Sequence, residues 1–368
     1  MVFYLLLFAY YIFIFFGHKT SDNKVLLIVI YLLPLFVLTA FRDISIGPDT
    51  SSYYFFFYKI NNCNSLADAF NVTGMEPGFV IINFLATRIH LSYYSLQFIF
   101  ALFIYFSFGK FFLDYSNNIP FSCFFFIANN YFFGIMNVLR MWLAISILLY
   151  SVRFIKSRQL IPFLSIVLLA MMFHYSAAFF LLLYPLASVN LTLDRLALVF
   201  IVSLVILLFA VPVFTFVTNT LGMYEGYISE ERFDVSNNIA IKLSFLVTVC
   251  FFVFSTYIKW SLIDRHLTIS GNLFVSNISL LDICYAALTV SVCLHIIGLS
   301  NNVMGRVINY YDVFLLILIP DLISVINSKK NRILTSFVIS SLLFIKFIVV
   351  LEFRPEWYQV LPYKFFWS

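Results

Sequence analysis

The chain has 368 residues, of which 63% are hydrophobic and 11% charged, and its formal net charge is +5. A soluble domain carries roughly a quarter charged residues, so this composition excludes a soluble globular protein. The basic residues are spread over loops and form no patch interleaved with aromatic side chains, so nucleic acid is not an expected partner.

Apolar segments long enough to cross a bilayer as helices recur along the whole chain. We therefore expect an all-α polytopic membrane protein, a single integral membrane domain over residues 1–368, with about 11–13 transmembrane or re-entrant helices. The expected spans are 2–16, 25–41, 92–112, 119–136, 138–155, 160–173, 175–187, 196–218, 240–258, 277–299, 307–326 and 333–351. Residues 77–90 form either a further span or a re-entrant segment. The first span lacks a basic flank and a cleavage site, which indicates a retained helix and not a signal peptide.

Orientation follows from the charges of the connecting loops. Short basic loops such as 151–159 and 327–332 are expected inside, and the acidic loops 42–76 and 219–239 are expected outside. With this threading, the outer side collects four features that are distant in sequence: the segment 41–58, Arg140, His174 and Arg306.

The segment FRDISIGPDTSSYYFFFY, residues 41–58, places a polar cluster directly after a charge-free apolar run. Arg42 can bind a phosphate oxygen in a bidentate manner, and Asp49 can contact a sugar or position a base. A structural alternative stays open, in which Asp49 only caps a short helix 51–60 and tyrosines such as Tyr53 form an interfacial belt.

Arg140 has no acidic residue within one helical turn, so we expect an anion to meet it, unless it reaches the lipid headgroups. Arg306, with Asn309 and Tyr310 on the same helix face, provides a surface for a polyanion or a sugar. The alternative for Arg306 is an ordinary arginine at a helix end.

His174 lies between two short spans, where it can serve as a general base or donate to a phosphate. A hydrogen-bonded structural histidine is the alternative. No histidine or cysteine spacing indicates a metal or disulfide framework, so we expect neither a metal nor a cofactor. Asp282 and Asp321 fall toward the inner side, where pairing with Lys259 or Arg332 across helices is expected.

The stretch FRDISIGPDTSSYYFFF resembles the signature of an arginine, then G-x-D-T, then tyrosine, that follows the second span of EpsG-like polysaccharide polymerases. These belong to the wider Wzy-type O-antigen and exopolysaccharide polymerases. MEPGFVIIN, NVLRMWLAISI, FHYSAAFFLL and GRVINYYDVFLLILIP resemble further parts of the family in the same order. The resemblance covers about residues 25–365. Tyr175 departs from it, because the family often has proline after the histidine.

The resemblance implies a glycosyltransferase-C-like helical fold in the bacterial inner membrane, with an active face on the periplasmic or extracellular side. It implies an enzyme that joins undecaprenyl-diphosphate-linked oligosaccharide repeat units, with the lipid diphosphate as leaving group, for lipopolysaccharide or exopolysaccharide. A chain-length regulator is implied as an additional partner. On this basis Arg42, Arg140 and Arg306 would bind the diphosphate, Asp49 or His174 would be the catalytic base, and Tyr53 and Tyr310 would contact sugar.

Three other functions stay open. A ligase that hands a finished chain to an acceptor lipid would usually have a large outer loop, whereas the longest expected here is about 35 residues. A glycosyl- or acyltransferase that uses a polyprenyl-phosphate-linked donor would add a single group. A flippase or transporter of lipid-linked sugars would need a continuous polar pathway, but glycine is scarce, at 11 residues, and no inverted repeat is evident.

Overall fold

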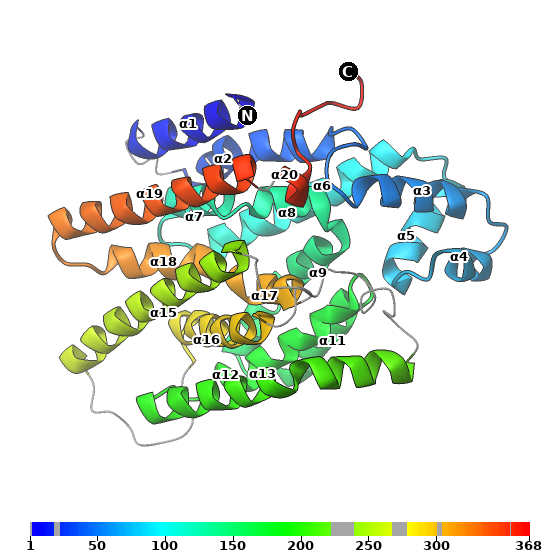
Figure 1. Ribbon diagram of the computed structural model, residues 1–368. Coiled ribbons are helices and arrows are strands. Elements are labelled where there is room, and N and C mark those ends of the chain that lie inside the picture. The colour runs from blue at the N-terminus through cyan, green and yellow to red at the C-terminus, as the bar shows by residue number, and fades with distance from the viewer. Residues whose placement is uncertain (1, 18–22, 222–238, 267–277, 300–303, 354) are drawn as a thin grey trace. The chain divides into compact units, whose positions relative to one another are not determined.

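The computed structural model describes the chain except for residues 1, 18–22, 222–238, 267–277, 300–303 and 354 (Figure 1). In the described residues every regular element is a helix, and one isolated antiparallel bridge joins Arg42 to Phe365. The all-α prediction is therefore confirmed. The chain divides into two compact units. Unit 1 comprises residues 1–154, 160–178 and 323–368, and unit 2 comprises 155–159 and 179–322. The prediction of a single domain stays a prediction.

Unit 1 carries most of the helices. They are α1 (Val2–Gly17), α2 (Lys24–Ala40), α3 (Thr50–Asn61), α4 (Leu66–Thr73), α5 (Pro77–Arg88), α6 (Tyr93–Tyr115), α7 (Ile119–Ala128), α8 (Tyr131–Asn137), α9 (Leu139–Leu149), α11 (Leu160–Met171), α19 (Lys329–Phe353) and α20 (Pro355–Tyr358). Three elements begin in one unit and end in the other: α10 (Val152–Lys156), η1 (Tyr175–Leu182) and α18 (Leu315–Ser324).

The core of unit 1 is built around α7, whose sequence IPFSCFFFIA is apolar on every side. A helix without a polar face must be buried all round, and Phe124, Phe125 and Phe126 are at most 1% exposed. Helices α1, α2 and α19 pack against α7, and α6 packs against α2 and α9.

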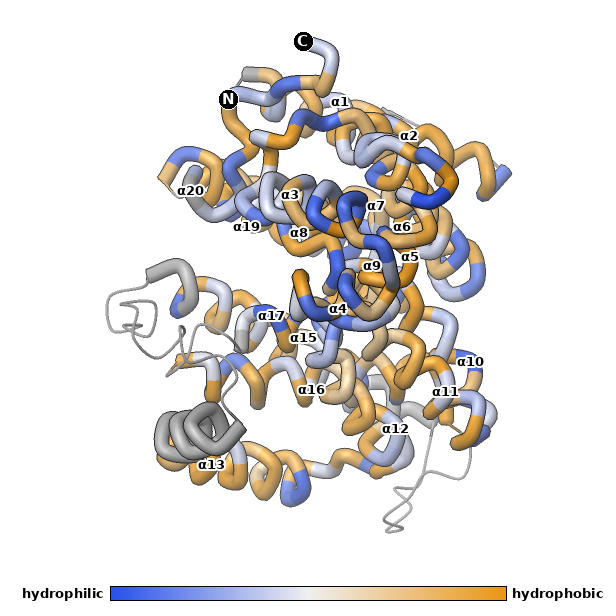
Figure 2. Tube along the Cα trace, turned by 90° about the vertical axis from the view of Figure 1, so that its right-hand side faces the viewer, coloured by the Kyte–Doolittle hydropathy of each residue, from blue (hydrophilic) through white to orange (hydrophobic). Residues whose placement is uncertain are grey.

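The short helices α3, α4 and α5 pack against one another at one end of unit 1 (Figure 1). The helix expected over 51–60 is confirmed as α3, but α4 was not predicted and turns the expected loop 42–76 into a helical segment. Ser65 and Asp68 start α4 with a reciprocal capping box, which is readable from the sequence. Figure 2 shows more hydrophilic residues at α4 and in the connecting segments than along the long helices.

Residues 359–366 form a non-helical tail that is hydrogen-bonded to the segment 41–47. The backbone N–H of Asp43 donates to the carbonyl of Lys364 over 3.0 Å, and that of Phe366 donates to Phe41 over 3.1 Å. The N–H of Gly47 donates to Gln359 over 3.2 Å. These bonds tie the sequence signature of the 41–58 segment to a segment more than three hundred residues away.

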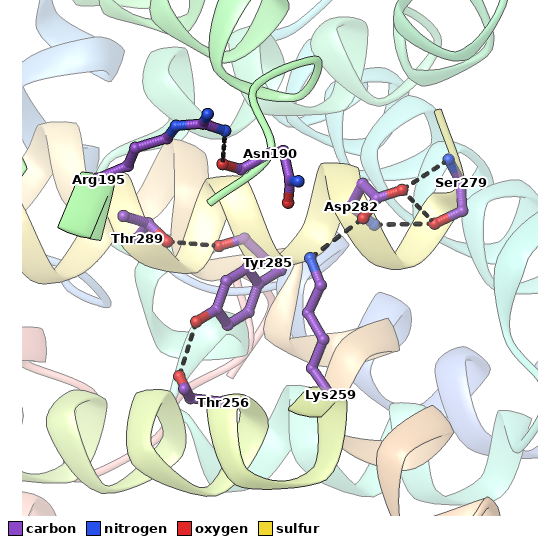
Figure 3. Close-up of polar contacts among 8 residues, drawn as sticks. All are labelled: Asn190, Arg195, Thr256, Lys259, Ser279, Asp282, Tyr285 and Thr289. Atoms are coloured by element: carbon purple, nitrogen blue, oxygen red, sulfur yellow. Dashed lines mark hydrogen bonds and ion pairs between the residues drawn. The ribbon is translucent and has the colours of Figure 1, made fainter. Parts of the chain in front are cut away.

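Unit 2 contains α12 (Leu183–Leu186), α13 (Leu193–Leu221), α15 (Ile239–His266), α16 (Leu280–Gly298), α17 (Met304–Asp312) and most of α18. α16 packs against α12, α13, α15 and α17, and its residues are buried along nearly the whole length. The predicted pairing of Asp282 with Lys259 is confirmed, with Nζ 3.1 Å from the carboxylate (Figure 3). Tyr285 lies beneath the same ammonium group and bonds to Thr256 over 2.7 Å.

Several described helices are long and apolar enough to cross a bilayer. They are α6, residues 242–261 of α15, α16 and α19, and the bent pairs α7–α8 and α17–α18 raise the number from four to six. Most of the other expected spans are apolar helices of 10–17 residues. At 12 residues, α5 is about 18 Å long and too short to cross the hydrocarbon core, which fits the re-entrant alternative for 77–90. The expected outer loop 219–239 lies largely outside the described residues.

Candidate functional site

Three ionisable side chains of unit 1 meet although they are far apart in sequence. The carboxylate of Glu76 accepts a hydrogen bond from Arg140 through Oε2, and its Oε1 lies 2.9 Å from Nδ1 of His174. We call Glu76, Arg140 and His174 the Glu76 cluster. Glu76 thus bridges the two other side chains, with one carboxylate oxygen on Arg140 and the other on His174.

The Glu76 cluster is shielded from solvent but not closed. The exposed fractions of the three side chains are 5% for Glu76, 13% for His174 and 21% for Arg140. Burial alone would raise the pKa of Glu76, but the hydrogen bond with His174 and the charge of Arg140 bring that pKa below its ordinary value. Glu76 is therefore an anion at neutral pH.

Glu76 is available to these partners because of its position at the start of α5. It occupies the N-cap of the helix, Pro77 takes the first helical turn, and the Glu76 side chain makes no capping bond. The helix N-terminus also favours a negative charge at this place. The sequence MEPG thus combines a helix start with a carboxylate that does not cap its own helix and can bind Arg140 and His174.

His174 is placed by the turn after α11, as the sequence predicted for the apex between two short spans. Its N–H donates to the carbonyl of Ala170 over 3.1 Å, and η1 follows directly. The N–H of Gly78 donates to the carbonyl of Met172 over 2.8 Å, which fastens α5 to this turn. A Cβ on Gly78 would lie 2.9 Å from both Cβ and O of Met172, so only glycine allows the approach.

The contact with Glu76 favours one tautomer of a neutral His174. A carboxylate on Nδ1 holds the proton of a neutral imidazole there, which leaves a lone pair on Nε2. The described residues supply no hydrogen bond to that second nitrogen. An imidazole oriented by a carboxylate, with its other nitrogen unoccupied, is the arrangement of a general base.

Aromatic rings surround the guanidinium group of Arg140. The guanidinium carbon lies 5.7 Å from the centre of the Tyr53 ring and 5.8 Å from that of Phe79. Tyr53 was predicted as a site residue, and the structure brings it to the Glu76 cluster. It is only 2% exposed, so it forms part of the wall around Arg140.

The residues of the 41–58 signature hold α3 against the end of α8. Gly47 has a φ of +88°, and a Cβ there would collide with the carbonyl oxygen of Met136. The hydroxyl of Thr50 lies 3.0 Å from the same oxygen and 2.7 Å from the carbonyl of Ile46. Arg140 lies four residues after Met136, in the first turn of α9. The signature turn therefore positions the start of the helix that carries Arg140.

Arg42 lies inside this turn with 0% exposure. Its guanidinium donates to the carbonyl of Thr39 over 2.5 Å and lies 3.5 Å from the hydroxyl of Thr50. This burial favours a role in holding the turn, and binding of the diphosphate by Arg42 stays a prediction. Asp49 occupies the N-cap position of α3 without a side-chain capping bond and is half-buried, so its assignment as a base also stays a prediction.

Arg306 and Tyr310 belong to α17 in unit 2. Arg306 is half-buried and Tyr310 is 1% exposed. Asn309 turns its amide to the carbonyl of Gly305 over 3.0 Å. Their roles in binding diphosphate and sugar, and the convergence of Arg306 with Arg42 and Arg140, stay predictions.

Glu76 is the residue that the sequence reasoning missed as a functional group. Arg140 was expected to meet an anion, but acidic residues were sought only within one turn of its own helix. A further signal was present, because Glu76 precedes Pro77 and Gly78 at the edge of an apolar segment. Among the described residues, no three histidine, cysteine, aspartate or glutamate side chains gather as a metal site.

Comparisons with known proteins identify one family. The model of the EpsG family matches residues 25–365, which is nearly the whole chain. No curated protein and no solved structure matches the chain, so the expected glycosyltransferase-C-like arrangement stays a prediction.

Proposed function

The chain belongs to the EpsG family of polysaccharide-polymerase-type membrane proteins, and on this premise we propose that it is a glycosyltransferase that polymerises lipid-linked repeat units. Its substrate would be an oligosaccharide on undecaprenyl diphosphate, and its product an O-antigen or exopolysaccharide chain. The reaction would take place at the outer face of the bacterial inner membrane, with a chain-length regulator as partner.

The Glu76 cluster carries this proposal, because its geometry fits the activation of a sugar hydroxyl. Nε2 of His174 would take the proton of the acceptor hydroxyl, whose oxygen attacks the anomeric carbon of the growing chain. Glu76 would hold the imidazole and stabilise the imidazolium that forms. The bond between the anomeric carbon and the diphosphate breaks, and the lipid diphosphate leaves with the electron pair.

Charge development supports the same assignment. With neutral His174, the charges of Glu76 and Arg140 cancel, and proton transfer to His174 makes the cluster positive. Positive charge therefore appears as the leaving diphosphate becomes more negative, and the partly exposed guanidinium of Arg140 can interact with it. A site that gains charge in this way favours the transition state over the bound substrate.

The proposal is tested by His174→Ala and Arg140→Ala in cells that depend on this chain for their surface polysaccharide. General-base catalysis contributes about 100-fold to 10,000-fold in rate, and Arg140 would stabilise the leaving diphosphate. We therefore expect both variants to lose the ladder of polymer lengths on a gel. His90→Asn and Arg153→Ala change exposed residues of the same types and should leave the ladder intact. Arg42→Ala and Arg306→Ala test the other two predicted diphosphate ligands in the same assay.

Membrane abundance must be measured beside each ladder, so that misfolding is not read as inactivity. An unchanged ladder in His174→Ala, at normal abundance, contradicts the role of His174 as the base. Deletion of the chain separates the alternatives: a polymerase leaves single lipid-linked repeat units on the outer leaflet, whereas a flippase leaves them on the inner leaflet. A transferase of single sugars would leave an incomplete repeat unit.

A further inference from the structure

A continuous series of aromatic rings crosses the surface of unit 1 from α3 to the tail. We call Tyr58, Tyr54, Tyr94, Phe366 and Trp367 the aromatic track. Ring centres are 4.7 Å apart for Tyr58 and Tyr54, 6.5 Å for Tyr54 and Tyr94, 4.5 Å for Tyr94 and Phe366, and 4.8 Å for Phe366 and Trp367. Tyr58, Phe366 and Trp367 are 43%, 37% and 59% exposed.

The aromatic track is a built feature and not a loose end of chain. The tail is bonded to the segment 41–47, and the Tyr363 hydroxyl donates to the carbonyl of Leu38 over 2.7 Å. Trp367 stacks on Phe365 at 4.7 Å with an interplanar angle of 11°, and its ring centre is 5.6 Å from that of Phe41. The rings that the tail contributes to the aromatic track are thus held in place before any ligand binds.

The chemistry of the track differs from that of surfaces suited to lipid. The described exposed hydrophobic side chains of α13 and α19 are mainly leucine, isoleucine and valine, which match acyl chains. The track instead combines aromatic faces with tyrosine hydroxyls, and exposed Ser51, Ser52 and Lys364 lie on the same segments. Flat apolar faces with a polar rim match a pyranose, which has C–H faces and a rim of hydroxyl groups.

The aromatic track starts on the helix that also carries a wall residue of the Glu76 cluster. Tyr54 follows Tyr53 on α3, and the Tyr53 ring lies 5.7 Å from the guanidinium carbon of Arg140. Tyr93, which precedes Tyr94, lies 5.3 Å from Tyr54, and its hydroxyl donates to the carbonyl of Thr50 over 3.4 Å. The buried rings of Tyr53 and Tyr93 thus anchor α3, which carries Tyr54 and Tyr58 of the track, in the same unit as the Glu76 cluster.

We propose that the aromatic track binds the saccharide part of the polymer, with successive sugars stacked on its rings. This inference rests on the proposed function. The track would hold the saccharide chain between successive transfers, so its loss should shorten the polymer without preventing the joining of two repeat units.

The first experiment compares Tyr58→Ala/Trp367→Ala with Phe106→Ala, which removes a 65% exposed aromatic ring of α6 outside the track. We expect the double variant to make polymer of at least two-fold lower modal length, with the amount of two-repeat product per molecule changed less than two-fold. Phe106→Ala should keep the wild-type ladder. A wild-type ladder in the double variant, at normal abundance, overturns the inference.

The second experiment measures binding directly with the full-length protein in nanodiscs. The probe is a size-fractionated set of oligosaccharides released by mild acid from the surface polysaccharide of the cells that carry this chain. Titration should change the tryptophan fluorescence of the wild type, and Trp367→Phe should lose that change. Equal responses of the two proteins overturn the inference.

A third measurement separates sugar from lipid as the occupant. Brominated acyl chains quench the fluorescence of tryptophan that contacts lipid. The emission of Trp367 is the difference between wild type and Trp367→Phe, and it should resist this quenching. Phe106→Trp in that background provides the lipid-exposed reference. Quenching of Trp367 as strong as that of the reference overturns the track as a glycan site. Oligosaccharide binding at Trp367 in a chain that makes no polymer would preserve the track and contradict the proposed function instead.

Discussion

At the scale of single residues, Glu76 determines the properties of the candidate site. It orients His174, compensates Arg140 and takes its place from the start of α5. An arginine within an apolar helix such as α9 needs a counterion, since an unpaired charge in such surroundings is costly. The sequence indicated that Arg140 requires a counterion but did not identify it. The partner, Glu76, lies 64 residues away, and only the folded chain brings it near.

Glu76→Gln should change the acid dependence of stability. The pKa of Glu76 is lower in the folded protein, since the effects of His174 and Arg140 outweigh that of burial. Such a carboxyl contributes stability above its unfolded pKa, and the contribution is lost as pH falls through the lower folded value. We expect wild type to lose more thermal stability than Glu76→Gln between about pH 6 and about pH 3.

The measurement is the melting temperature in detergent as a function of pH, with Glu352→Gln as an exposed control on α19. Parallel curves for wild type and Glu76→Gln would contradict the ion pairs described for this residue. The same variant should reduce polymer formation about 100-fold or more, because glutamine stabilises an imidazolium poorly.

At the scale of elements, the signature turn acts through the placement of helices. Gly47, Thr50 and Arg42 resemble a family motif in sequence, and a motif in an otherwise apolar chain suggested ligand contacts. The structure shows that Gly47 and Thr50 contact the carbonyl of Met136 at the end of α8, directly before α9. The short helix α3 was predictable from its start signal, whereas this contact depends on long-range packing that no local pattern encodes.

Gly47→Ala should destabilise unit 1. The new Cβ would require both a strained positive φ and displacement of the Met136 carbonyl, at a cost of roughly 1–3 kcal/mol or more. We expect a lower melting temperature and less protein in the membrane. Gly305→Ala on α17 is the matched control, because the described part of the chain has no atom within 4 Å of its added Cβ and alanine favours a helix. Equal stability of the two variants would contradict the role of Gly47.

At the scale of the whole molecule, composition was sufficient to predict a helical membrane protein. The predicted spans recur as helices, but their lengths vary more than a uniform crossing requires, for example from 10 residues in α7 to 29 in α13. Bends between α7 and α8 (55°) and between α17 and α18 (42°) break two of them. Hydropathy reports how apolar a segment is and not where its axis turns, so the bends were not predictable from the sequence.

The predicted orientation is open to a labelling test. Ser65→Cys lies in the acidic segment expected outside, and Ser157→Cys in the basic loop expected inside, and both positions are exposed. We expect a membrane-impermeant maleimide to label Ser65→Cys in intact cells, and Ser157→Cys only after permeabilisation. The unmodified chain serves as the background control for its native cysteines. The reverse pattern would place the Glu76 cluster on the wrong side for the proposed reaction.

The pairing of residues 359–366 with 41–47 has a consequence for biosynthesis. The segment 41–47 leaves the ribosome long before residues 359–366 are synthesised, so the hydrogen bonds between the two segments form late. Until then, its unsatisfied amides and aromatic side chains are open to insertion factors and proteases. A product that stops before residue 359 lacks these hydrogen bonds and should therefore be degraded sooner.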